Sequence, residues 1–160
     1  ANWPGGWFRV ANPLAGGITL AGMFGAWLAV SWRLRRWSAT PAEWESWFNV
    51  GARVFPWSWA LIRAGCFLAH DEPGVKTTFP LAVVYPDGPR HDLALYELLW
   101  AAVMIAVKPT MRQLLFTYAL LRITLHWLRP ERHGLDLLLS ALLLLAAVTW
   151  PELLRRTARI

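Results

Sequence analysis

The chain has 160 residues, of which 56% are apolar and only 16% charged, and its formal net charge is +6. A soluble domain usually carries about a quarter charged residues, so this balance is unusual for a protein in water. The arginines stand in short clusters beside apolar runs, which favours anionic lipid over nucleic acid as a partner. A single cysteine, Cys66, excludes an internal disulfide and a cysteine-based metal site.

Five apolar runs are separated by basic or proline-containing segments, and we expect each to form a helix that spans a membrane. They cover about residues 14–32, 47–69, 93–107, 112–128 and 135–150. A soluble helical bundle is the alternative, but the last run has no polar face to present to water. The sequence therefore predicts an all-α membrane protein in which residues 1–160 form a single domain.

Two prolines bear on the expected helices, since proline disfavours a helix interior. Pro56 is expected to interrupt the second run, and Pro151 follows the end of the fifth. The polar loop 70–92 separates the second and third runs, and within it residues 79–85 could form a short strand or hairpin arm. The chain opens at Ala1 without a charged segment, so no signal peptide is expected.

The distribution of basic residues predicts the topology. The ends that carry more of them should lie in the cytoplasm, which places the N-terminus and the polar loop outside and the C-terminus inside. The cytoplasmic set is Arg33, Arg35, Arg36, Lys108, Arg112, Arg155, Arg156 and Arg159, and the outer set is Arg9, Lys76, Arg90, Arg129 and Arg132.

Three arginines, Arg53, Arg63 and Arg122, fall inside apolar runs, where ionisable residues usually face the bundle interior or a wet cavity. Arg63 and Arg122 lie toward the outer ends of their runs, at the level of Tyr96 and Glu97. A guanidinium group at that depth could donate paired hydrogen bonds to the phosphate of a phospholipid headgroup. The alternatives are a structural Arg63–Glu97 ion pair or an arginine that extends to the headgroups, and all three stay open.

Other notable residues have a functional and a structural interpretation. Gly16 and Gly17 could let a lipid approach the backbone or form a close helix-packing face. Cys66 is more often a packing residue than a nucleophile. His126 is more often a hydrogen-bonded structural residue than a haem or pigment ligand, since no second histidine lies in the other runs. No zinc spacing, phosphate loop or hydrolase triad is present, so neither a metal nor a cofactor other than bound lipid is expected, although a pigment stays open.

Three adjoining segments carry a resemblance to a known family. Residues 62–74, IRAGCFLAHDEPG, look like a signature that reads G-R-x-G-N/C-F and continues to an acidic residue and a glycine. Residues 79–91 are similar to the arm that follows this signature. Residues 91–97, HDLALYE, resemble the motif H-P-x-Q-L-Y-E.

Two further matches lie on either side of these segments. Residues 15–18, AGGI, align with a motif H-G-G followed by an apolar residue. Tyr118, Arg122 and Arg129 match the pattern Y-x-x-x-R with a second arginine seven residues later. In this order and spacing, over about the whole chain, the motifs resemble the prolipoprotein diacylglyceryl transferase family.

That resemblance implies a function at the outer face of the bacterial inner membrane. The family transfers a diacylglyceryl group from phosphatidylglycerol to the lipobox cysteine of a prolipoprotein, and the five runs would correspond to the last five of its seven spans. By resemblance, Arg63 and Arg122 would hold the phosphatidylglycerol headgroup. The candidate lipid-binding residues are Arg63, Arg122, Gly16, Gly17, Gly65, Tyr96 and Arg129.

The departures from the family pattern concern its acid and base groups. Ala15 stands where the motif has histidine, and His126 stands where it has an acid. Because a methyl group cannot move a proton, we expect catalysis to be lost. An active divergent transferase and a non-catalytic subunit of a larger membrane complex, photosynthetic or respiratory, both stay open. The remaining candidate catalytic residues are Glu97, Asp71, His91 and His126.

Overall fold

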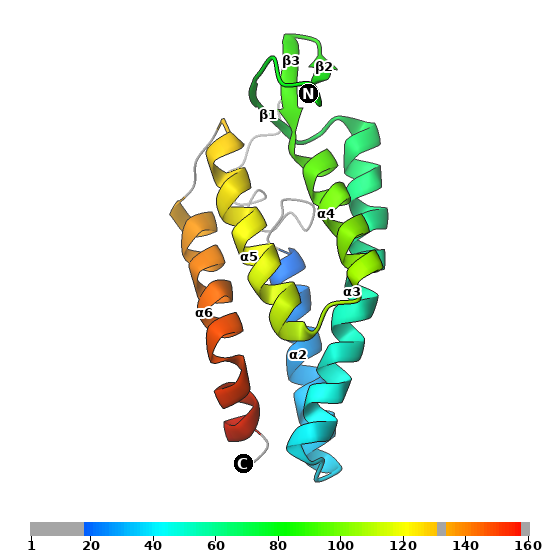
Figure 1. The fold of residues 1–160 in the computed structure, drawn as a ribbon, viewed down its shortest axis with the longest axis vertical. Coiled ribbons are helices and arrows are strands. Elements are labelled where there is room, and N and C mark those ends of the chain that lie inside the picture. The colour runs from blue at the N-terminus through cyan, green and yellow to red at the C-terminus, as the bar shows by residue number, and fades with distance from the viewer. Residues whose placement is uncertain (1–17, 131–133, 158–160) are drawn as a thin grey trace, which may run out of the picture.

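The computed structural model describes residues 18–130 and 134–157, which form five helices and a small three-stranded sheet. The helices run side by side, and the sheet lies beyond one end of the bundle (Figure 1). The helices are α2 (Ile18–Arg36), α3 (Pro41–Ala69), α4 (Leu93–Val107), α5 (Met111–Leu128) and α6 (Gly134–Thr157).

The predicted helical class is confirmed, with the small sheet as an addition to it. Each of the five apolar runs corresponds to one helix. Within the described residues, no helix is both long enough and apolar enough to qualify as a membrane span.

Helix α3 begins six residues before the predicted start at residue 47, because a capping box precedes the apolar run. The Thr40 hydroxyl accepts a hydrogen bond from the Glu43 amide, and the Glu43 carboxylate accepts one from the Thr40 amide at 2.7 Å. The expectation that Pro56 interrupts this helix is wrong, since α3 continues through it. Pro56 and the preceding turn, at Ala52, are buried against the bundle, and this packing offsets the lost backbone hydrogen bond.

Helix α6 likewise continues past its predicted end at residue 150 and contains Pro151. The expected stop at this proline is therefore wrong. The Trp150 ring packs edge-on against Phe48 of α3, with ring centroids 5.2 Å apart. This contact packs the turn around the proline against α3.

An aromatic cluster forms the core near the middle of the bundle, where α3, α4 and α5 meet. The Tyr118 ring stands at 87° to the Trp59 ring with centroids 5.8 Å apart, and it lies 5.1 Å from the Trp100 ring. Such tilted pairs contribute about 0.5–1.5 kcal/mol beyond burial. The cluster fixes the three helices next to the charged residues described below.

The sheet is antiparallel, with β1 (Pro73–Lys76), β2 (Val83–Tyr85) and β3 (Gly88–Asp92) in the order β1-β3-β2. The expected hairpin is present as β2 and β3, although residues 79–82 form a turn instead of strand. Strand β1 was not predicted. Gly74 allows it to lie close to the bundle, because an added Cβ would come within 2.9 Å of the carbonyl oxygens of His91 and Leu128.

Candidate functional site

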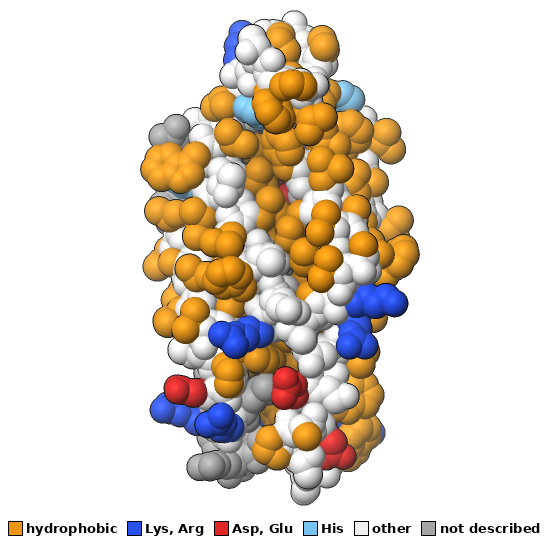
Figure 2. All heavy atoms as spheres, in the orientation of Figure 1, with side chains coloured by type: hydrophobic (Ala, Val, Ile, Leu, Met, Phe, Trp, Pro, Cys, Tyr) orange, Lys and Arg blue, Asp and Glu red, His pale blue; other side chains and the backbone are white. Residues whose placement is uncertain are grey.

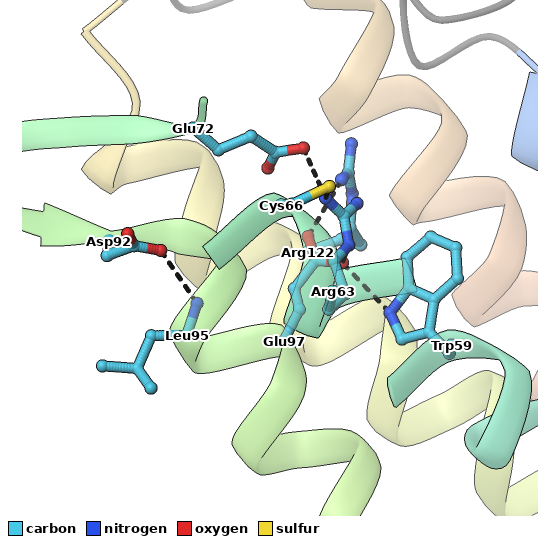
Figure 3. A network of polar contacts seen from close by, with 8 residues as sticks. All are labelled: Trp59, Arg63, Cys66, Glu72, Asp92, Leu95, Glu97 and Arg122. Atoms are coloured by element: carbon cyan, nitrogen blue, oxygen red, sulfur yellow. Dashed lines mark hydrogen bonds and ion pairs between the residues drawn. The ribbon is translucent and has the colours of Figure 1, made fainter. Parts of the chain in front are cut away.

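Glu97 of α4 is 0% exposed and lies at the centre of a network of polar side chains (Figure 3). Its carboxylate accepts a hydrogen bond from the Trp59 indole at 3.1 Å. Two arginines pair with the same carboxylate: Arg63 Nε lies 2.8 Å from Glu97 Oε2, and Arg122 Nη1 lies 3.4 Å from Glu97 Oε1. The Arg63 Nε–H bond is not directed at the oxygen, so that contact is an ion pair without a hydrogen bond. A buried carboxylate is stable only with such partners, so Glu97 joins α3, α4 and α5.

Arg63 extends the network toward the sheet. It is 7% exposed, and its Nη1 atom pairs with Glu72 in the link between α3 and β1. The same nitrogen lies 4.0 Å from the Cys66 sulfur, and the guanidinium carbon lies 4.6 Å above the Trp59 ring. Arg63 therefore contacts both carboxylates and an aromatic face.

Local structure explains why these side chains meet. Trp59 and Arg63 are four residues apart on α3, and side chains at this spacing share one face of a helix. Asp92 fixes the start of α4, because its buried carboxylate accepts hydrogen bonds from the Leu95 amide at 2.9 Å and the Tyr85 hydroxyl at 2.7 Å. Glu97 follows about one and a half turns later and faces α3.

The hydrogen bond between Tyr85 and Asp92 joins the sheet to the bundle. Burial, together with this carboxylate, raises the pKa of the Tyr85 hydroxyl above its ordinary value of 10.0. The phenol therefore stays protonated and keeps donating across the physiological range. This hydrogen bond holds the junction between β3 and α4.

Cys66, Asp71 and Glu72 bring donor atoms within 4.8 Å of one another, a grouping that could accept a metal ion. However, Arg63 already binds Glu72 and lies beside the Cys66 sulfur. A metal would have to displace this guanidinium and withstand its charge. The three side chains therefore fit the arginine network better than a metal site.

The sequence model of the prolipoprotein diacylglyceryl transferase family matches residues 6–151, which is most of the chain. The chain belongs to this family. No curated protein and no solved structure matches it.

The structure brings together several residues that the transferase-family motifs had singled out. Arg63, Arg122 and Glu97 are in contact, and the Arg63–Glu97 ion pair, one of the alternatives left open by the sequence, is present. Arg129, just after α5, lies near enough to Glu97 to interact with it electrostatically. Asp71 lies beside Cys66 at the edge of the network.

Other candidates lie elsewhere in the transferase-family fold. The His91 ring nitrogen Nδ1 and the Tyr96 hydroxyl are 2.6 Å apart and form a separate pair. His126 is buried, its Nδ1 atom has no hydrogen-bond partner within the described residues, and its ring packs against Trp127. Gly65 faces open space, so its missing side chain is not required by a neighbour. Ala15, Gly16 and Gly17 lie outside the described residues.

Sequence reasoning missed two members of the network. Trp59 was not among the predicted site residues, although its spacing of four residues from Arg63 is a detectable signal of a shared face. Glu72 was passed over because the transferase motif draws attention to the preceding Asp71. Only the folded link between α3 and β1 shows that Glu72, not Asp71, pairs with Arg63.

Proposed function

We propose that this chain is a membrane-integral protein that holds the headgroup of an anionic phospholipid at Arg63 and Arg122. The observation that carries the proposal is the convergence of these two guanidinium groups, from α3 and α5, on the single carboxylate of Glu97. Planar guanidinium groups match the oxygens of a phosphodiester. The family match supports a phospholipid as the source of that phosphate.

Membrane integration is supported by the surface and by the family, and not by the hydropathy of any one helix. Large apolar side chains cover the visible face of the bundle, while charged side chains gather toward the end opposite the sheet (Figure 2). Leu61 and Leu68 of α3 are 78% and 77% exposed. Exposed apolar side chains of this kind support contact with lipid or with a protein partner.

The same considerations support an orientation. The sheet would face the outside of a bacterial inner membrane, and the C-terminal end of α6 would face the cytoplasm. Basic residues near the end opposite the sheet support this direction, since Arg33, Arg35 and Arg36 close α2 and Arg155 and Arg156 close α6.

The difference in burial between the two glutamates suggests how a headgroup enters. The Glu97 side chain is 0% exposed, whereas that of Glu72 is 29% exposed. Glu72 can therefore leave Arg63 for water, and a lipid phosphate can take its place. The Arg122 side chain is 18% exposed, and its Nη1 atom lies 3.4 Å from the carboxylate that Arg63 also contacts, so both guanidinium groups are within reach of the same phosphate.

Removal of the Arg122 charge tests this site. Loss of one charge-assisted contact costs about 1.5–3 kcal/mol, so Arg122→Gln should bind phosphatidylglycerol about 10- to 100-fold more weakly. Native mass spectrometry of the purified protein measures this, with Lys76→Gln as a control that removes an exposed charge from β1. Equal binding by the wild type and Arg122→Gln would refute the proposed headgroup site.

We further propose that diacylglyceryl transfer has been lost. Ala15 replaces the motif histidine, and the candidate histidine of β3, His91, pairs with Tyr96 outside the network. The exposed apolar surface is then available to other membrane subunits. An active divergent transferase remains the second candidate, because Asp71 places a carboxylate beside the Cys66 and Glu72 group.

A transfer assay separates these two candidates. Loss of an acid or base group typically costs 10²–10⁴-fold in rate, so we expect no transfer from phosphatidylglycerol to a lipobox peptide above background. Ala15→His is the informative variant, since activity gained there would locate the defect in that one group. Robust transfer by the wild-type protein would establish the active enzyme instead.

A further inference from the structure

A second polar region lies at the end of the bundle opposite the sheet. A cavity of about 500 Å³ opens between the N-terminal turns of α3, the start of α5 and the last turns of α6. A smaller hollow of about 340 Å³ shares part of its wall. The residues that matter here are Glu45 and Asn49, common to both, and the arginines Arg53, Arg112 and Arg155 around them.

These arginines differ from those of the Glu97 network in their partners. Arg53, Arg112 and Arg155 are exposed to solvent, and within the described residues they make no hydrogen bond and no ion pair with other protein groups. Glu45 is the one carboxylate on the described walls of the two hollows, and none of the three guanidinium groups is within ion-pair distance of it. The region therefore carries an excess of two positive charges.

Helix ends contribute less to this potential than the arginines do. Both α3 and α5 start at the cavity with about half a positive charge each, and the C-terminal end of α6 brings about half a negative charge to the same wall. Asn49 already accepts the hydrogen bond of the Met111 amide at 2.8 Å, and Thr110 caps the next turn. These first-turn amides are therefore already hydrogen-bonded, and the arginine side chains supply the donors for a ligand.

We infer that this cavity binds the phosphate of an anionic ligand, and that in the membrane this ligand is the headgroup of an acidic phospholipid in the cytoplasmic leaflet. The inference rests on the membrane integration proposed above. The charged end directly borders the apolar surface in Figure 2, so acyl chains could follow the helices while the phosphate reached the arginines. Trp150 in the cavity wall provides an apolar contact for the glycerol backbone.

A purely topological role would explain the arginines without a site, because basic residues near cytoplasmic helix ends set orientation wherever they stand. The two explanations differ in their dependence on position. A site requires Arg112 and Arg155 in the cavity wall, whereas a general electrostatic attraction would be weakened equally by the loss of Arg35, which lies at the same end of the bundle but not in either hollow.

The test compares Arg112→Gln/Arg155→Gln with Arg35→Gln in the full chain, purified in a neutral detergent. Native mass spectrometry counts bound short-chain phosphatidylglycerol, with phosphatidylcholine and inorganic phosphate as the other probes. We expect two phosphatidylglycerol molecules on the wild type, loss of one with at least 10-fold weaker binding in the double variant, and no change in Arg35→Gln. The thermal unfolding temperatures of all variants should stay close to that of the wild type.

Each contrary result has a separate meaning. An unchanged lipid count in the double variant, with Arg122→Gln still losing one lipid, would refute this inference and leave the proposed function intact. Equal losses in the double variant and Arg35→Gln would show general attraction and also overturn it. If inorganic phosphate bound as tightly as phosphatidylglycerol and depended on the same two arginines, the phosphate site would stand and its assignment to a lipid would fail.

Discussion

At the scale of single residues, Glu97 and Glu72 bind the same arginine in different surroundings. Glu97 is enclosed by Trp59, Arg63 and Arg122, so its charge holds three helices together. Glu72 sits in the link before β1 and is partly exposed. Burial decides the consequence, because an ion pair in water contributes little, whereas a buried charge without its partner is costly.

Matched substitutions separate these roles. Glu97→Gln should lower the free energy of unfolding by about 3–5 kcal/mol, since Arg63 and Arg122 lose their common counterion. Glu72→Gln should cost less than about 1 kcal/mol and should strengthen phosphatidylglycerol binding, because it removes the competing carboxylate. Denaturant unfolding and lipid titration measure the two effects. Weaker lipid binding by Glu72→Gln would contradict the exchange of Glu72 for the headgroup.

At the scale of elements, the sequence predicted the helices better than their ends or the sheet. Five long apolar runs, separated by basic or proline-containing segments, predicted five helices. Pro56 and Pro151 were expected to interrupt and to follow runs, but tertiary packing outweighs their local preference. Strand β1, Pro73–Lys76, carries no alternating pattern, and it forms because β3 and the end of α5 offer it a surface.

The hairpin of β2 and β3 provides a prediction in pH. Hydrogen bonds from Arg90, one at 2.9 Å, hold the pKa of the Asp87 carboxyl at about 2, below its ordinary value of 3.8. A lowered pKa means that this stabilisation is complete above pH 3.8 and is lost as the pH falls through about 2. NMR titration of the carboxyl carbon measures it, with Arg90→Gln as the control. Titration near 3.8 in the unaltered chain would show that the pair does not form.

At the scale of the whole molecule, two clusters of arginine lie at opposite ends of the bundle. The one near the sheet is paired with carboxylates around Glu97, and the other lines an open cavity whose described wall holds one carboxylate. Sequence position indicated the convergence of Arg63 and Arg122, because their depths along two helices agreed. It could not indicate the cavity, since Glu45, Arg112 and Arg155 come from three separate segments.

The central claim is that a phospholipid phosphate occupies the space between Arg63 and Arg122, and a structure of the protein in nanodiscs containing phosphatidylglycerol tests it most directly. The account predicts a lipid phosphate in hydrogen-bond contact with both guanidinium groups, Glu97 unmoved, and Glu72 turned away from Arg63. A structure in which Glu72 stays on Arg63 and no lipid phosphate contacts Arg122 would contradict it.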